Sequence, residues 1–205
     1  MNEFALYLQL GYEHITDPNG YDHIIFIIAL CAIYRLRDWR RVLILVTAFT
    51  LGHSITLALA TLQYIQYRTD VIEFLIPVTI LFTAITNLFQ KSRTDSILTP
   101  DPPVNATPRY LMALFFGLIH GMGFSNFLRS LLGKEASIVK PLLAFNIGLE
   151  LGQLLIVLII LSIAWVLIDL FRVKKHDWKL VVSGAVAGIA VILIKESDYW
   201  KELMG

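Results

Sequence analysis

Long apolar runs separated by short polar connections are the main pattern of this sequence. A membrane-spanning helix needs about 20 mostly apolar residues, because each residue adds about 1.5 Å along the helix axis. By this measure the pattern predicts an all-α, polytopic helical membrane protein with a single transmembrane domain over residues 1–205. Six spans are predicted, at about residues 21–36, 41–63, 70–89, 109–127, 137–171 and 180–194. The shorter apolar stretch at residues 3–12 predicts an interfacial helix before the first span.

The composition supports a membrane protein and excludes several other classes. Hydrophobic residues make up 57% of the chain and charged residues 16%, against roughly 25% charged residues in soluble domains. A net charge of +1 does not point to nucleic acid, and membrane lipid is the expected surrounding. Cys31 is the single cysteine, so no disulfide can form within one chain. No Lys or Arg precedes Arg35, so we expect no cleaved secretory signal.

The distribution of Lys and Arg predicts the orientation in the membrane. With the N-terminus outside, the cytoplasmic connections carry eleven of the 17 basic residues and the outer segments carry six. Because basic residues accumulate in cytoplasmic loops, both termini are predicted to lie outside. The longest connection, residues 91–107, contains three prolines between positions 100 and 103 and predicts a linker between two halves of three spans each.

Three ionisable residues fall in the middle of predicted spans. His53 is 12 residues past Arg41 and His120 is 11 residues past Arg109, which places both about 17 to 18 Å from the cytoplasmic surface. Glu150 lies about 15 Å inward from the opposite surface, so we expect the three at one depth. Glycines beside His120 and Glu150 would allow their helices to approach closely. An unpaired carboxylate at this depth is unfavourable, so Glu150 is expected to be paired, protonated or bound to a cation.

A second group of polar residues lies where the first span begins. His14, Asp22 and His23 occur there within the stretch GYEHITDPNGYDHIIF. Imidazole and carboxylate together suit a divalent transition metal such as nickel, cobalt or zinc. The predicted ligands of one or two sites are His14, Asp22, His23, His53, His120 and Glu150. Side chains expected to orient these ligands are Ser54, Thr50, Asn146 and Gln153.

Each histidine also has a simpler interpretation. A single intramembrane histidine can be a hydrogen-bonded packing residue, which applies to His53 and to His120 taken alone. His14 precedes a turn-forming segment, Asp17 to Gly20, and can be a solvated turn residue. His176 lies in a basic connection and is expected to be a solvated surface group.

Four blocks of this sequence together resemble the HupE/UreJ family of small membrane proteins. The blocks are GYEHITDPNGYDHIIF, FTLGHSITLAL, FGLIHGMGF and FNIGLELGQ, in that order along the chain. The family is associated with hydrogenase and urease accessory functions, and its members are regarded as nickel or cobalt permeases. The resemblance implies a bacterial inner (plasma) membrane location, and partners among metalloenzyme maturation proteins or a second copy of the chain. It implies functional roles for His14, Asp22, His23, His53, Ser54, His120, Asn146 and Glu150.

Three functional hypotheses follow. The first is a Ni²⁺ or Co²⁺ permease or metal-binding membrane protein, in which His14, Asp22 and His23 capture the ion and the midplane residues hold it. The second is an intramembrane zinc hydrolase, with Ser54 or Glu150 in proton transfer. The third is a membrane assembly subunit without catalytic activity, whose buried polar residues hold the helices together.

Overall fold

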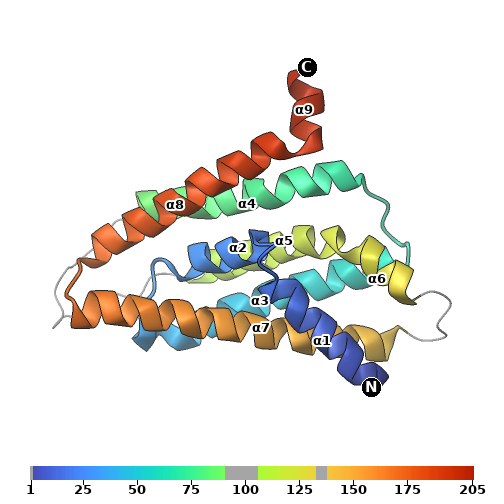
Figure 1. Ribbon diagram of the computed structural model, residues 1–205, viewed down its shortest axis with the longest axis horizontal. Helices are drawn as coiled ribbons and strands as arrows, with labels where there is room; N and C mark the ends of the chain where they lie inside the picture. Colours follow the sequence, from blue (N-terminus) through green and yellow to red (C-terminus); the bar gives the residue numbers. More distant parts are fainter. Residues whose placement is uncertain (1, 91–105, 133–137) are drawn as a thin grey trace.

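The computed structural model describes residues 2–90, 106–132 and 138–205, and these residues form helices with no strand among them (Figure 1). The helices are α1 (Glu3–Thr16), α2 (Asp22–Cys31), η1 (Leu36–Asp38), α3 (Trp39–Thr61), α4 (Thr69–Phe89), α5 (Thr107–Gly123), α6 (Ser125–Leu132), α7 (Val139–Trp165), η2 (Val166–Leu170), α8 (Lys175–Glu196) and α9 (Asp198–Met204). The prediction of an all-α helical membrane protein is therefore confirmed. The predicted linker at 91–107 lies outside the described residues except for its last two positions.

Four helices are long and apolar enough to cross a membrane. They are Leu36–Thr61, Thr69–Phe89, Val139–Leu170 and Lys175–Glu196. Helices α5 and α6 meet at a 49° bend next to Phe124 and make a fifth candidate if the pair is one broken span. The described residues thus give four or five candidate spans at the predicted positions, and the total of six stays a prediction.

Helix α2 differs from the predicted first span. It has 10 residues and ends at Cys31, so it is about 15 Å long and too short to cross a bilayer alone. It lies between the α4–α8 pair and α7, and most of its apolar side chains are buried (Figure 1). Because the helix is surrounded by protein, its first residues begin inside the bundle instead of at the membrane surface. This placement determines where His23 lies.

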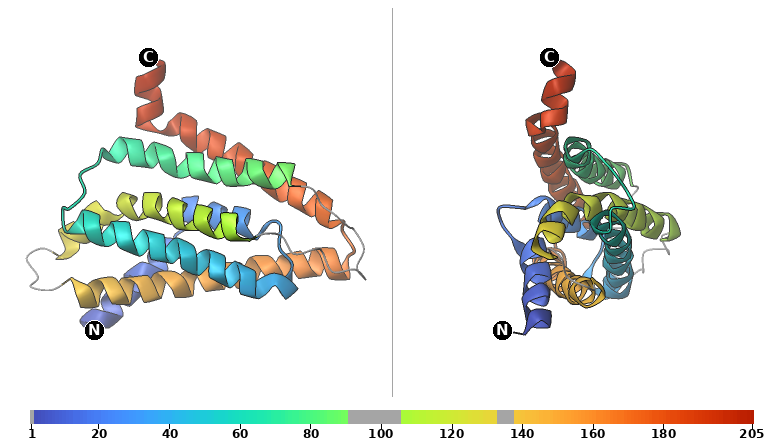
Figure 2. Two further views of the ribbon diagram at one scale, coloured as in Figure 1. Left: turned by 180° about the vertical axis from the view of Figure 1, so that it is seen from behind. Right: turned by 90° about the vertical axis from the view of Figure 1, so that its right-hand side faces the viewer.

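The helices pack mainly as three pairs, α3 with α5, α1 with α7, and α4 with α8 (Figure 2). Two of these pairs are in backbone contact at glycines. A Cβ atom on Gly148 of α7 would lie 1.9 Å from the carbonyl oxygen of Leu8 on α1, and one on Gly11 would lie 1.9 Å from that of Phe145. On α5, a Cβ on Gly117 would lie 2.2 Å from the carbonyl oxygen of Phe49 on α3. Small residues at a helix contact allow the two backbones to approach this closely.

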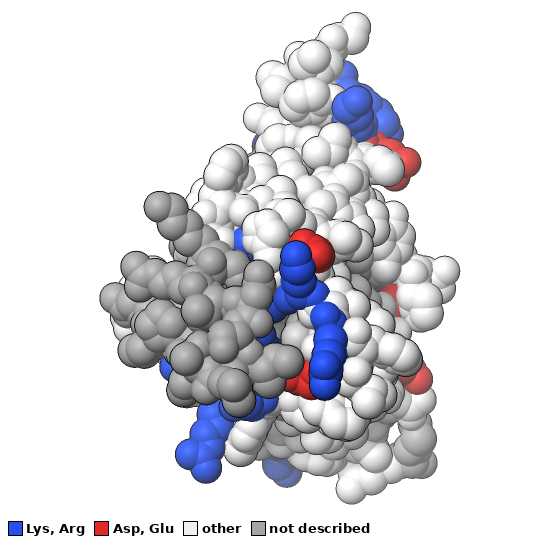
Figure 3. All heavy atoms as spheres, turned by 90° about the vertical axis from the view of Figure 1, so that its left-hand side faces the viewer, with Lys and Arg blue, Asp and Glu red and all other residues white. Residues whose placement is uncertain are grey.

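Basic residues gather at the end of the bundle where α2 runs into α3 and α7 runs into α8 (Figure 3). Those connections and the helix turns that follow them hold Arg35, Arg37, Arg40, Arg41, Arg172, Lys174 and Lys175. We call this the basic end. It is the end predicted to face the cytoplasm.

The glycine contact between α1 and α7 leads to a prediction about stability. Gly148→Ala should lower the free energy of unfolding by about 1 to 3 kcal/mol, because the added methyl group meets rigid backbone. Gly188→Ala on α8 is the matched control, since no atom lies within 4 Å of its Cβ position, and it should be neutral or slightly stabilising. Thermal denaturation of both variants in one detergent measures the difference. Equal midpoints for the two variants would contradict the close contact.

Candidate metal site

Four of the five histidines meet inside the helix bundle. They come from four helices: His14 from α1, His23 from α2, His53 from α3 and His120 from α5. The ring centroids of His14 and His23 are 4.7 Å apart, and that of His120 is 5.3 Å from His23. The ring of His53 lies 5.9 Å from His14 and 6.2 Å from His23. We call these four residues the histidine cluster.

Five of the eight ring nitrogens of the cluster are buried and lack a hydrogen-bond partner. One ligand atom from each of His14, His23 and His53 can be chosen so that all three atoms lie within 4.8 Å of one another. Among the described residues, the buried imidazole nitrogens without a hydrogen-bond partner are Nε2 of His14, His23 and His120 and both nitrogens of His53. A buried polar atom without a partner destabilises the fold by about 1 to 3 kcal/mol. Several such atoms pointing into one place are the arrangement expected of a site that holds a ligand.

Two hydrogen bonds orient rings of the cluster. The Nδ1–H of His23 donates to Asp22 Oδ1 over 3.1 Å, and the Nδ1–H of His120 donates to the carbonyl oxygen of Phe116 over 2.8 Å. In both rings this leaves Nε2 with its lone pair free to bind a metal ion. Asp22 therefore lies where it can fix the tautomer of His23, whether or not it also binds an ion.

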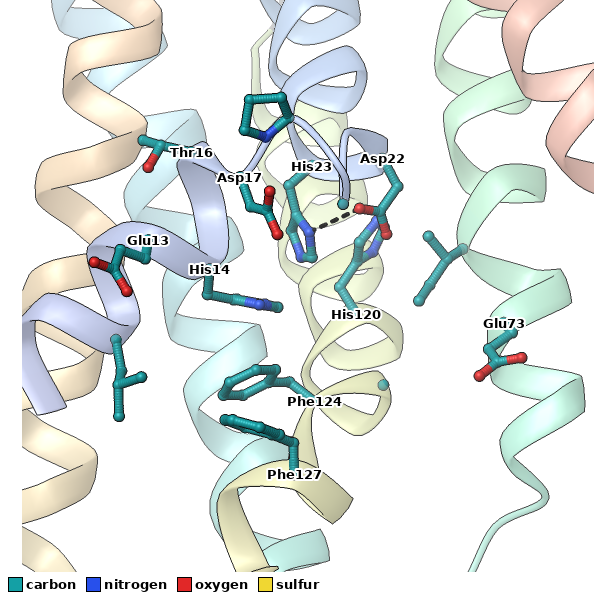
Figure 4. A pocket seen from close by; sticks show the side chains of 15 residues that line it. Glu13, His14, Thr16, Asp17, Asp22, His23, Glu73, His120, Phe124 and Phe127 are labelled. Carbon is teal, nitrogen blue, oxygen red and sulfur yellow. Dashed lines mark hydrogen bonds and ion pairs between the residues drawn. The ribbon is translucent and has the colours of Figure 1, made fainter. Parts of the chain in front are cut away.

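Three of the four histidines line an open pocket of about 670 Å³ (Figure 4). Four carboxylates line it too: Glu13, Asp17, Asp22 and Glu73. Among the described residues that line it, none is Lys or Arg. Such a negative pocket attracts cations. His53 is fully buried and does not line the pocket, so it lies behind the other three rings.

Glu13, Asp17 and Glu73 were not among the predicted site residues. Glu73 reaches the pocket from α4, on the side opposite His14, so only the tertiary structure reveals it (Figure 4). Glu13 directly precedes His14 in the sequence. Its position beside a candidate ligand was the one signal that could have identified it.

Aromatic rings form the wall next to His14. The ring of Phe124 lies 4.0 Å from that of His14 and stacks on Phe145 at 4.9 Å. Phe127 lines the pocket beside Phe124 (Figure 4). Burial, together with the neighbouring His23, lowers the pKa of His14 well below its ordinary value of 6.5. Its imidazole is therefore neutral at neutral pH, as a metal ligand must be.

The structure brings together histidines that were predicted to lie at two different depths in the membrane. His14 and His23 were expected at an outer mouth, with His53 and His120 below them at the midplane. Instead all four form one cluster, because α2 begins inside the bundle. His14 lies in the last turn of helix α1 and not in a surface turn. In contrast, His176 is exposed at the basic end, as expected.

Glu150 lies apart from the cluster. Its carboxylate accepts a hydrogen bond of 2.6 Å from Thr47, which precedes His53 by six residues and so lies about 9 Å from it along α3. Helix α7 begins at Val139, close to the Lys140 start used for the expected depth of Glu150, but the contact with Thr47 places the carboxylate nearer the basic end than His53. Its role as a ligand stays a prediction.

The four residues predicted to orient the ligands are also placed. Thr50 donates to Gln153 over 2.7 Å, and Ser54 donates to the backbone carbonyl of Thr50 over 2.7 Å. The Oδ1 atom of Asn146 is buried without a partner. The hydrogen bonds found for Thr50, Ser54 and Gln153 thus go to groups other than imidazole. Their role in orienting the metal ligands stays a prediction.

A family model described as HupE / UreJ protein matches residues 1–199, which is nearly the whole chain. The chain belongs to the HupE/UreJ family. Neither the curated proteins nor the solved structures contain a significant match to it.

The hydrogen bonds of His23 and His120 predict their tautomers. In the metal-free protein, both rings should carry the proton on Nδ1 and none on Nε2. Nitrogen chemical shifts of protein labelled with ¹⁵N-histidine measure this, and a His120→Gln variant assigns the signals. A proton on Nε2 of His120 would contradict the proposed orientation of its ring.

Proposed function

We propose that this member of the HupE/UreJ family is a membrane permease or binding protein for a divalent transition metal ion, with Ni²⁺ or Co²⁺ as its cargo. The observation that carries the proposal is the group of partnerless imidazole nitrogens beneath an acidic pocket. The carboxylates at the pocket attract the cation, and the neutral imidazoles below bind it.

The donor atoms favour a transition metal. Imidazole nitrogen suits nickel, cobalt and zinc, whereas Mg²⁺ and Ca²⁺ prefer oxygen ligands. The three histidines whose ligand atoms lie within 4.8 Å of one another are the proposed ligands. His120 lies outside this group, with its ring 5.3 Å from that of His23. The association of the family with nickel enzymes favours nickel or cobalt over zinc.

Two observations weigh against the other hypotheses. A zinc hydrolase needs a group for proton transfer beside the metal, and both candidates are engaged with other groups, because Ser54 donates to the carbonyl oxygen of Thr50 and Glu150 accepts from Thr47. Histidines that only hold helices together are expected to hydrogen-bond to neighbouring groups. Both ring nitrogens of His53 lack such a partner.

Removing one imidazole tests the site. His23→Ala should weaken Ni²⁺ binding by at least about tenfold, and Asp22→Asn should weaken it by about 10- to 100-fold because the tautomer of His23 is no longer fixed. His176→Ala is the matched control, since this histidine is exposed at the basic end, and it should bind as the wild type does. Isothermal titration of the purified protein with NiCl₂ gives all three affinities. Unchanged binding in His23→Ala would refute the proposed site.

The pH dependence of binding tests the same ligands differently. Protons compete with the metal for imidazole, so affinity should fall as the pH falls. Because burial lowers the pKa of His14 below 6.5, binding should persist through pH 6.5 and weaken only at lower pH. Titrations with NiCl₂ between about pH 5 and 8 locate the midpoint. A midpoint above pH 7 would contradict a site made of buried, neutral histidines.

A further inference from the structure

Polar side chains continue beyond the histidine cluster, between α3 and α7. They are Thr47 and Thr50 of α3, and Asn146, Glu150 and Gln153 of α7. We call these five residues the α3–α7 polar seam. Thr47 donates to Glu150 over 2.6 Å and Thr50 donates to Gln153 over 2.7 Å. Two direct side-chain bonds therefore join helices that are apolar over most of their length.

The surroundings of the seam make these polar groups unfavourable unless they have a role. The neighbouring residues Ile44, Leu51, Ile147 and Leu151 are exposed apolar side chains on the outside of the bundle. A carboxylate in the hydrocarbon region is unfavourable by a few kcal/mol or more, so intramembrane carboxylates commonly mark ion or proton pathways. Packing of α3 on α7 does not require Glu150, because apolar residues would serve that purpose.

Two buried polar atoms of the seam have no partner. Gln153 is fully buried and its Nε2 lacks a hydrogen bond, while the Oδ1 atom of Asn146 is buried and unpaired. Asn146 and Glu150 are four residues apart, which places them on one face of α7. An unpaired amide oxygen and a carboxylate on one face supply oxygen ligands to a cation.

The seam lies on the side of the cluster away from the pocket. His53, Thr50 and Thr47 follow one another at three-residue steps along α3, toward the basic end. His53 is fully buried behind the three histidines of the pocket, and both its nitrogens are unpaired. Along α3 the order from the pocket is therefore the three pocket histidines, then His53, then the buried Thr50, and then Thr47, which bonds Glu150 at the exposed edge of the bundle.

We propose that the α3–α7 polar seam is a second, weaker site for the transported divalent cation, with the Glu150 carboxylate as its main ligand. This inference rests on the proposed function and extends it from one binding site to two, with the second at the exposed edge of the α3–α7 contact. The carboxylate supplies the negative charge that the apolar surroundings lack. Oxygen ligands hold nickel or cobalt less firmly than imidazole does, so an ion that leaves His53 can be released toward the basic end. Passage through a membrane needs several sites, each weak enough to let the ion go.

The roles of the α3–α7 polar seam and of the histidine cluster can be distinguished by measuring metal binding and metal transport in the same variants. Glu150→Gln removes the charge and keeps the shape. It should lower ⁶³Ni²⁺ uptake into proteoliposomes by at least about tenfold and abolish the weaker of two NiCl₂ binding steps, while the affinity of the tighter step, at the histidine cluster, stays within about twofold of the wild type. Glu150→Asp retains a carboxylate and should recover part of the uptake. Glu196→Gln, an exposed carboxylate of α8, is the matched control and should change neither measurement.

The outcomes distinguish failure of the second site at Glu150 from failure of the proposed metal-binding function. Uptake by Glu150→Gln within twofold of the wild type would overturn the second site, and so would a parallel weakening of the tighter binding step, which would assign Glu150 to the histidine cluster. If the wild-type protein neither binds nor transports Ni²⁺, the proposed function itself fails. The titrations of the wild type and of His23→Ala test that function without reference to Glu150. If Glu150→Gln does not fold, Thr47→Val removes only the hydrogen bond to Glu150. It should reduce uptake and leave binding intact, and unchanged uptake would overturn the proposal.

Discussion

Backbone contact at glycine determines where the histidines can lie. His53 follows Gly52, whose Cβ position is 2.1 Å from the carbonyl oxygen of Leu114, and His120 lies between Gly117 and Gly121. These contacts hold α3 against α5 so closely that both rings enter one space. The contact of α1 with α7 places His14 in the same space. A side chain at any of these glycines would separate the helices and, with them, the ligands.

Much of the helical fold follows from the sequence because a lipid environment permits few structures. Backbone polar groups in the hydrocarbon region must be satisfied within the helix, so a long apolar run predicts a helix with near-correct ends. The predicted span at 70–89 and the helix Thr69–Phe89 agree closely for this reason. The rule is weaker for short segments. A 10-residue helix such as α2 is shorter than a membrane-spanning helix must be, and it can lie within the bundle because other helices surround it.

Sequence patterns predict helices but not their packing, and this explains which parts of the site could be predicted. Ionisable residues in apolar runs are conspicuous, so His23, His53 and His120 could be identified from the sequence alone. Their convergence could not, because it depends on where α2 begins and on how α1 turns into it. Glu73 gave no signal, since a glutamate in the first turns of a helix is common and only the packing of α4 brings it to the pocket. The separation of Glu150 from the histidines depends on its bond to Thr47, which links residues 103 positions apart.

The four carboxylates that line the pocket also bear on competition between ions. Carboxylate oxygen accepts Mg²⁺ and Ca²⁺ readily, so the entrance does not distinguish them from a transition metal. These abundant ions would occupy the entrance and screen its charge, and the rate at which a scarce metal arrives would fall as their concentration rises. They would compete poorly for the imidazoles behind it. Under the proposed function, dissolved Mg²⁺ and Ca²⁺ would therefore slow the binding of a transition metal without changing which metal the imidazoles prefer.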